Sequence, residues 1–363
     1  MSSSTNIAFA ALTDIGRVRE NNEDTYIAKL IWDDRHVLIA AIDGMGGEEG
    51  GEIAASIARD AIVKYLEDFH NDTPLNLIKR AVADANNEIV RYKEAQPKYR
   101  RMGCVATAGI FDLEANTLSI AHVGDSRLYS YSHGELKKLT HDHSLVGYQE
   151  EQGILTEEQA MRHPRRSVIE RCLGDEIHYS EDKSFIEAAV FPLISDSTFL
   201  FCSDGLSDVL RSSEIAECLE QDMPVEEKCK LLIDKANEAG GKDNITVALV
   251  KVWQETEEIQ NPQISEKKEF PSEVKKNDKK ESSHNKWLWI ILIVLTFVMV
   301  SGIILYHFGT IEPKPVKVPT MPASQQTLVE KDTVGPDTLP DCVLPTTIVE
   351  DVDSLQTTLN HEN

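Results

Sequence analysis

The stretch Leu38-Ile39-Ala40-Ala41-Ile42-Asp43-Gly44-Met45-Gly46-Gly47 is an apolar run that ends in one carboxylate and a cluster of glycines. A short, partly β-branched run that is closed by glycines predicts a buried strand. An isolated carboxylate at the end of such a strand is unfavourable, so we expect a positive charge to meet Asp43. The glycines allow the backbone to turn sharply and to approach a ligand or ion closely. A plain Asp-Gly turn is the alternative.

The composition is that of a globular protein long enough to bury a large core. Of 363 residues, 41% are hydrophobic and 27% are charged, and the formal net charge is -24. This charge argues against nucleic-acid binding, and it is compatible with carboxylates that hold a metal. The cysteines show no CxxC spacing, so we expect no zinc site and no disulfide framework, as in a reducing compartment. They are Cys104, Cys172, Cys202, Cys218, Cys229 and Cys342.

Apolar alternation predicts strands on both sides of the central stretch, and helical periodicity predicts two helices directly after it. The predicted strands are residues 7–13, 25–31, 104–112, 117–123, 127–131, 185–191, 198–202 and 245–252. The predicted helices are residues 50–69, 74–93 and 224–239. We expect the first two helices to pack as one layer. We also expect the strands between residues 104 and 131 to be consecutive and antiparallel.

The composition changes after residue 253, so residues 1–253 are predicted to form one folded domain. Residues 254–286 are rich in Glu, Lys and Ser without an apolar period, which predicts a linker. Residues 287–306 carry no charge. As a helix this segment would span ~30 Å, which is the thickness of the hydrocarbon core of a bilayer. With tryptophans at its start and Tyr306 at its end, it is predicted to be a transmembrane helix.

The residues that flank this segment predict its orientation. Seven lysines lie between residues 254 and 286, whereas Lys314 and Lys317 follow the segment. The positive-inside rule then places residues 1–286 in the cytoplasm, and the first residues lack the positive start of a signal peptide. Residues 307–363 hold seven of the 14 prolines and are predicted to be a Pro/Thr-rich extracytoplasmic tail. We therefore expect a single-pass protein of the inner membrane.

Several predicted turns deliver carboxylates from apolar strands. These acids are Glu23, Asp24, Asp43, Asp125, Asp204 and Asp243. Clustered carboxylates repel one another and resist burial, so they either take up protons or hold cations. No histidine or cysteine stands beside them in ligand spacing, and oxygen donors alone favour Mg²⁺ or Mn²⁺. The alternative is that each acid is only a turn residue or a helix cap.

The order and spacing of these motifs resemble the metal-dependent serine/threonine protein phosphatases of the protein phosphatase 2C family, in its bacterial branch. The resemblance covers residues 6 to 252. It rests on Arg19-x-x-x-Glu23-Asp24, Asp43-Gly44-x-Gly46-Gly47, Val123-Gly124-Asp125-Ser126-Arg127, Ser203-Asp204-Gly205 and Asp243-Asn244. It implies an α+β fold, a β-sandwich of two antiparallel sheets flanked by helices, with metals between the sheets at one end. Residues 1–253 would then be the catalytic domain.

The resemblance also implies roles for individual residues. Asp43 would bridge two Mn²⁺ or Mg²⁺ ions, Asp204 and Asp243 would complete the shell of one, and Glu23 with the Gly44 carbonyl would serve the other. Asp125, with Asp204, would hold a third, weaker ion. Arg19 would hold the substrate phosphate, which suits its planar fork of donors. A hydroxide held between the two ions would hydrolyse phosphoserine and phosphothreonine on proteins.

Some positions depart from the family pattern. Many eukaryotic members have a histidine after Asp-Gly, where this chain has Met45, so the proton for the leaving group must come from elsewhere. The usual Gly-Thr-Thr is Gly103-Cys104-Val105 here, which we interpret as a packing variant. His141 and His143 are expected in a turn role more than as general acids. Residues 140–174 match the variable flap beside the active site.

Other enzyme classes fit poorly. No cysteine is followed six positions later by arginine, as a cysteine-dependent phosphatase requires, and the DxD pair Asp351-Val352-Asp353 stands in the predicted tail. The alternative from another class is a catalytically silent, membrane-tethered protein that binds phosphoproteins or senses a signal. As partners we expect phosphorylated proteins, among them a membrane-bound serine/threonine kinase and its substrates.

Overall fold

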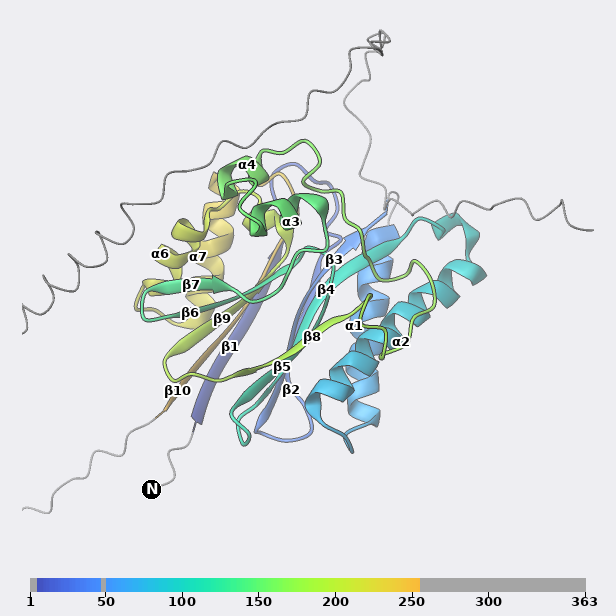
Figure 1. Cartoon of the computed structure of the whole chain (residues 1–363), viewed down its shortest axis with the longest axis horizontal. Helices are drawn as coiled ribbons and strands as arrows, with labels where there is room; N and C mark the ends of the chain where they lie inside the picture. Colours follow the sequence, from blue (N-terminus) through green and yellow to red (C-terminus); the bar gives the residue numbers. More distant parts are fainter. Residues whose placement is uncertain (1–4, 47–49, 255–363) are drawn as a thin grey trace, which may run out of the picture. The chain divides into compact units, whose positions relative to one another are not determined.

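The computed structural model describes residues 5–46 and 50–254, which contain two five-stranded antiparallel sheets (Figure 1). The first sheet has the order β1 (Thr5–Asp14), β10 (Ile245–Gln254), β9 (Ser197–Cys202), β6 (Arg127–Ser132), β7 (Glu135–Lys138). The second has the order β2 (Thr25–Leu30), β3 (His36–Met45), β4 (Gly103–Asp112), β5 (Thr117–Val123), β8 (Glu187–Pro192).

Helices cover the outer face of each sheet (Figure 1). The second sheet is covered by α1 (Gly50–Asp68) and α2 (Pro74–Ala95), which share one apolar core with it. The first sheet is covered by α6 (Ser212–Glu220) and α7 (Val225–Glu238). Shorter helices lie in the connections: η1 (Pro97–Tyr99), α3 (Leu145–Glu151), α4 (Glu157–Met161) and α5 (Asp204–Ser207). The two sheets with helices on both outer faces are the architecture that the resemblance implied.

Strand β3 is buried on both faces, which explains its continuous apolar run. Leu38, Ala40 and Ile42 belong to the core under α1 and α2. The alternate residues Val37, Ile39 and Ala41 belong to the core between the two sheets. Because side chains alternate along a strand, Asp43 continues the second set. The strand therefore delivers its carboxylate to the space between the sheets.

One prediction about the strands is wrong. The strands at residues 104–112 and 117–123 do pair as β4 and β5, but the third, β6, lies in the other sheet, between β9 and β7. The turn of Gly124, Asp125 and Ser126 carries the chain from one sheet to the other. Gly124 has φ +111° there, and a Cβ at this position would overlap the side chain of Val105. Only glycine suits this crossing.

Strand β7 and the helices η1, α5 and α6 were not predicted from the sequence. Strand β7 reads Glu-Leu-Lys-Lys and lies at the edge of its sheet, so it carries almost no apolar alternation. Within residues 5–46 and 50–254, no helix is both long and apolar enough to span a membrane. The predicted transmembrane helix at 287–306, the tail at 307–363 and nearly all of the linker at 254–286 lie outside the described residues.

The core between the sheets gives a first prediction. Phe201 is fully buried there, with its ring 6.3 Å from that of Phe111. We expect Phe201→Ala to lower the free energy of unfolding by about 3–5 kcal/mol, because the cavity would not collapse in a core shared by two sheets. Phe69→Ala is the matched control, since Phe69 is 54% exposed, and it should cost about 1 kcal/mol or less. Equal losses in denaturant unfolding would contradict this account of the core.

Candidate metal centre

One cavity of roughly 1320 Å³ is lined by every residue to which the sequence analysis gave a role. These residues come from the turn after β1, the end of β3, the β5–β6 crossing, the start of α5 and the loop before β10. They are Arg19, Glu23, Asp43, Gly44, Asp125, Asp204 and Asp243. Segments far apart in the sequence therefore bring their predicted site residues to one place.

Asp43 lies among other carboxylates. Burial raises its pKa well above the ordinary value, and the charges of Asp24, Asp204 and Asp243 raise it further. The guanidinium group of Arg19 donates to Asp243 Oδ2 over 2.8 Å. The charges that act most strongly on Asp43 are thus negative ones. A bound cation would supply the positive partner that the sequence led us to expect there.

The turn before β2 is fixed against the end of β3. The Glu23 N–H donates to Asn244 Oδ1 over 2.8 Å, and the Glu23 carbonyl accepts from the Gly44 N–H over 3.1 Å. A Cβ on Gly44 would overlap the carbonyl oxygens of Glu23 and Gly51, so only glycine fits. Close backbone packing therefore sets the position of Glu23 relative to Asp43.

Asp24 is the residue next to Glu23 that the sequence analysis left without a role. It is 8% exposed, and burial raises its pKa to about 7. Its Oδ2 atom has no hydrogen-bond partner among the described residues. The charge of Asp24 is also the largest one acting on Asp43. Asp24 is therefore part of the buried acid cluster, beside the predicted ligands.

Asp204 and Asp125 also belong to this group of acids. Burial raises the pKa of Asp204 well above its ordinary value, and Asp208, Asp243 and Asp125 add to the shift. Burial also raises the pKa of Asp125 to about 7. Asp208 lines the same cavity and was missed, although the i, i+4 spacing from Asp204 would place both on one side of a helical turn.

This donor set fits a divalent metal ion. The cluster offers carboxylate and carbonyl oxygens, which Mg²⁺ and Mn²⁺ prefer, and a buried carboxyl oxygen of Asp24 without a partner. Without cations the acids keep protons, as their raised pKa values indicate. Glu23, Asp43, Gly44, Asp125, Asp204 and Asp243 are the residues that would hold such ions.

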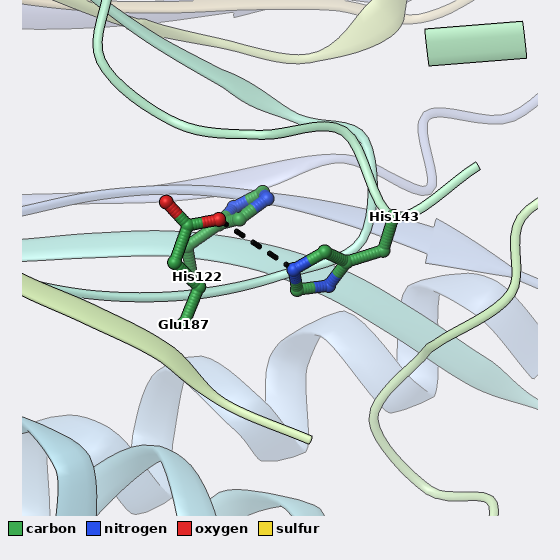
Figure 2. A group of neighbouring side chains, drawn as sticks. All are labelled: His122, His143 and Glu187. Carbon is green, nitrogen blue, oxygen red and sulfur yellow. Dashed lines mark ion pairs between the residues drawn. The ribbon is translucent and has the colours of Figure 1, made fainter. Parts of the chain in front are cut away.

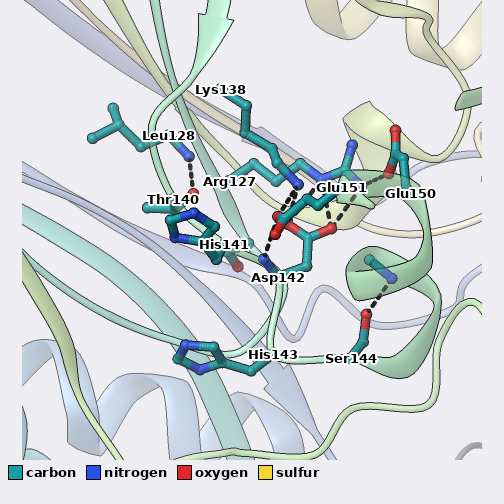
Figure 3. Close-up of polar contacts among 12 residues, drawn as sticks. Arg127, Leu128, Lys138, Thr140, His141, Asp142, His143, Ser144, Glu150 and Glu151 are labelled. Atoms are coloured by element: carbon teal, nitrogen blue, oxygen red, sulfur yellow. Dashed lines mark hydrogen bonds and ion pairs between the residues drawn. The ribbon is translucent and has the colours of Figure 1, made fainter. Parts of the chain in front are cut away.

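An ion-pair network fixes the chain next to Asp125 (Figure 3). Arg127 donates to Asp142 Oδ2 from Nε over 2.9 Å and from Nη2 over 2.6 Å, and its Nη2 also reaches Glu150 over 3.0 Å. Lys138 lies 3.2 Å from Asp142 Oδ1. Burial alone would raise the pKa of Asp142, but Arg127 and Lys138 lower it below the ordinary value. The network connects β6, β7 and α3, and it makes Arg127 a structural residue.

His122, His143 and Glu187 form a second cluster, with ligand atoms within 4.8 Å of one another (Figure 2). The Nδ1 atom of His143 accepts the Gly124 N–H over 3.1 Å, so the proton of the neutral ring is on Nε2, 3.6 Å from Glu187. The Nε2 atom of His122 lies 3.0 Å from the His141 carbonyl, which only accepts. Burial lowers the pKa of His122 to about 4, so this ring is neutral.

Neither ring therefore has a lone pair to offer a metal at Nε2. The cluster is a hydrogen-bonded brace behind the Gly124–Asp125 turn, where the His143 N–H also donates to the Gly124 carbonyl over 2.7 Å. No histidine lines the cavity within the described residues. His143 has the turn role that its sequence position suggested. Residues 140–174, the predicted flap, contribute Met161, Arg162 and Arg166 to the cavity.

The raised pKa values predict how the metal-free protein responds to pH. Asp24 and Asp125 have pKa values of about 7 when folded, against 3.8 ordinarily, so the folded state holds more protons between these values. Folding stability should therefore fall as the pH rises from about 5.5 to about 7.5 in EDTA. Thermal unfolding at the two pH values measures this loss of stability, and Asp24→Asn should reduce the difference between the two pH values.

With saturating Mn²⁺ the fall in stability with pH should disappear or reverse, because metal binding needs deprotonated ligands. A metal-free protein that is more stable at the higher pH would contradict the raised pKa values of the acid cluster.

Comparisons with known proteins agree with this geometry. The family model described as protein phosphatase 2C matches residues 17–249. The serine/threonine phosphatase stp of Listeria monocytogenes serotype 4b is 36% identical over 247 residues, which cover 66% of this chain and 93% of that protein. PstP of Mycobacterium tuberculosis is 35% identical over 247 residues, 68% of this chain and 45% of that protein.

Solved structures show the same fold. The Mycobacterium tuberculosis phosphatase PstP/Ppp superimposes with a TM-score of 0.59 at 33% identity, over 68% of this chain and 98% of that one. The catalytic domain of PstP, in complex with two manganese ions, gives a TM-score of 0.60 at 31% identity, over 69% and 100% of the two chains. The matched family model and these relatives cover the domain that carries the acid cluster. The chain belongs to the protein phosphatase 2C family.

Proposed function

We propose that this chain is a metal-dependent phosphatase that hydrolyses phosphoserine and phosphothreonine on proteins. The observation that carries the proposal is the convergence of carboxylates from separate segments on one cavity that also contains Arg19. Relatives that are identical to it at about a third of the aligned residues are serine/threonine phosphatases by name, and one structure of PstP holds two manganese ions. Cofactors of the same kind, two Mn²⁺ or Mg²⁺ ions and a third at Asp125, fit the donors here.

The residues divide into ligands and a phosphate binder. Asp43 is central because its strand enters the space between the sheets, where the charges of Asp24, Asp204, Asp243 and Asp125 all act on it. Asp43 would bridge two ions. Asp204 and Asp243 come from the first sheet's side of the cavity, and Glu23 with the Gly44 carbonyl from the second. Ions bound there would supply Lewis acidity and a nucleophile at neutral pH.

Arg19 is suited to hold the substrate phosphate. Burial lowers its pKa, but the neighbouring Asp243 more than offsets this, so the guanidinium stays charged. The bond from Nη2 to Asp243 orients the group and leaves other guanidinium N–H groups that could donate to a phosphate's oxygens in a forked geometry. Arg19 is thus a positioning group that also stabilises negative charge on the phosphoryl oxygens.

The alternative of a catalytically silent phosphoprotein-binding protein is disfavoured by the same cluster. Binding a phosphate needs cations such as Arg19 and does not need buried acids with raised pKa values. Such acids oppose folding unless they bind protons or metal. Their presence at the floor of the cavity is explained by catalysis with metal.

The roles predict distinct kinetic effects. Hydrolysis of phosphothreonine peptides should require Mn²⁺ or Mg²⁺ and stop in EDTA. Asp43→Asn should lower kcat by roughly 100-fold or more, the scale on which one charge-stabilising group acts in an active site. Arg19→Ala should raise KM by roughly 10-fold or more, since hydrogen bonds to charged groups contribute ~1.5–3 kcal/mol. Asp234→Asn, at an exposed position outside the cavity, is the control.

Two results would contradict these roles. Full activity in metal-stripped protein would remove the reason for the acid cluster. An Arg19→Ala variant that changed the metal requirement but not KM would show that Arg19 acts on the metals and not on the phosphate.

We further propose that the chain is tethered to the cytoplasmic face of the inner membrane by residues 287–306. The support is the sequence alone: an uncharged segment, preceded by seven lysines and followed by a Pro/Thr-rich tail. The catalytic domain would then act next to membrane-bound phosphoproteins. A transmembrane serine/threonine kinase and its substrates are the partners that this position favours.

The proposed topology can be tested with protease added to intact spheroplasts. The tail that contains Cys342 should be digested, whereas residues 1–286 should survive until the membrane is permeabilised. Digestion of the catalytic domain in intact spheroplasts would overturn the orientation and the kinase hypothesis with it. Recovery of the whole chain in the soluble fraction would overturn the anchor.

A further inference from the structure

The charge of the side chains that line the cavity changes from negative at its floor to positive at its rim. Its floor holds the half-buried acids Asp43, Asp125 and Asp204, whereas its rim is rich in exposed cations. Eight of its 29 lining residues are Lys or Arg, against 37 of 363 in the chain. Four of the eight come from the last turn of α2 and the short segment after it: Lys93, Lys98, Arg100 and Arg101. In a protein with a net charge of -24, this concentration at the mouth of the active site needs its own explanation.

The basic turn, residues 97–101, has a fixed backbone. Its η1 helix is closed by bonds from Tyr99 N–H to the Gln96 carbonyl over 2.9 Å and from Arg100 N–H to the Pro97 carbonyl over 3.3 Å. The Tyr99 ring packs on Tyr92, with the ring centres 5.9 Å apart. The side chains of Lys98, Arg100 and Arg101 are exposed on this rigid backbone. A charged surface that is ordered before binding loses less entropy when a ligand binds.

The basic turn borders the central carboxylate. Strand β4 begins directly after it, and Gly103 at its start pairs with Met45 of β3. A Cβ on Gly46 would lie 3.1 Å from the Arg101 carbonyl oxygen, so the two backbones are in contact. Gly46 is three positions after Asp43. A peptide whose phosphate reached Asp43 would therefore place its neighbouring residues over the turn, at ~3.3 Å per extended residue.

We propose that the basic turn is a subsite for an anionic side chain of the substrate, a carboxylate or a second phosphate, within roughly two to four residues of the phosphate that is removed. The inference rests on the proposed function, because the position of the subsite is defined by a phosphate at Asp43. Arginine forks pair with carboxylate and phosphate oxygens through two hydrogen bonds. Cations bound at the floor would offset the acids there, so the rim would dominate what a peptide meets.

A phosphopeptide fits this surface better than an anionic membrane does. The four cations line the same cavity as the metal ligands, where a peptide can reach both, whereas a bilayer requires charges spread over an outward surface. The net charge of -24 also opposes docking of the whole domain on anionic lipid. Binding to lipid is therefore the outcome that would overturn the proposal.

The test uses the full chain in detergent with Mn²⁺ and three phosphothreonine peptides. One carries glutamates beside the phosphothreonine, one carries glutamines, and one carries a phosphoserine that cannot be removed, such as a phosphonate analogue. The acidic peptide and the doubly charged analogue should each exceed the glutamine peptide in kcat/KM by roughly 3- to 10-fold, the range for one or two partly exposed charge pairs. The preference should shrink as salt rises.

The variant Arg100→Gln/Arg101→Gln should lose this preference and keep its hydrolysis of a small aryl phosphate. Lys183→Gln/Lys230→Gln is the charge-matched control, because both lysines are exposed and lie outside the cavity. The control should keep the preference. Comparing the glutamate peptide with the phosphonate peptide shows whether a carboxylate or a second phosphate is the better ligand.

The proposal would be overturned if the unmodified protein showed no preference for the acidic peptides, or if the double variant kept that preference unchanged. It would also be overturned if the double variant lost binding to phosphatidylserine vesicles while its peptide preference stayed intact. Loss of all hydrolysis, of aryl phosphate and peptides alike, would instead refute the proposed function. In that case fluorescence anisotropy of the phosphonate peptide decides the subsite by itself. Equal affinity for the double variant and the control would then refute it.

Discussion

The mutual repulsion of buried carboxylates is the constraint on which this structure depends. Asp24, Asp43 and Asp204 would each bind water strongly if exposed, yet Asp24 is buried, and Asp43 and Asp204 are half-buried, within reach of one another's charge. Their pKa values rise as a result, so without metal the cluster binds protons, and bound cations would replace those protons. Such a cluster persists only on a scaffold that cannot relax. The scaffold here is β3, whose neighbours are fixed on both edges and both faces.

The two packed sheets bring acids that are far apart in the sequence together in one site. Alternation along β3 assigns one set of residues to the helices and the other to the facing sheet, and Asp43 belongs to the second set. In the other sheet, Phe199 and Phe201 of β9 face the same inner core, and the strand ends next to Asp204. The acids of both sheets thus follow strand ends that lie close together. The brace of His143 on Gly124 fixes the crossing that brings Asp125 to the same place.

Much of this site could be predicted from sequence because the acids follow apolar strands into glycine turns, a local pattern. The predictions failed where the information was not local. That β6 leaves the sheet of β5 depends on Gly124 packing against Val105, and β7 has no alternation to detect. Asp24 stands beside Glu23 and looks like a turn acid, since only the fold shows that it is buried. Asp208 has a helical spacing from Asp204, but a helix of four residues gives no periodic signal.

The acids of the cavity lie at its floor and the cations lie at its rim. This arrangement explains how so acidic a protein can attract acidic substrates. At physiological ionic strength the net charge is screened beyond ~8 Å, so an approaching phosphoprotein responds to the charges nearest the cavity. Those nearest charges are the lysines and arginines of the basic turn and of the flap. The deeper acids would act on bound metals and not on the substrate, because those cations would offset them before a phosphate arrives. We therefore expect the residues of the rim to discriminate between substrates. The floor would contact only the phosphate, so it would not distinguish one phosphorylated residue from another.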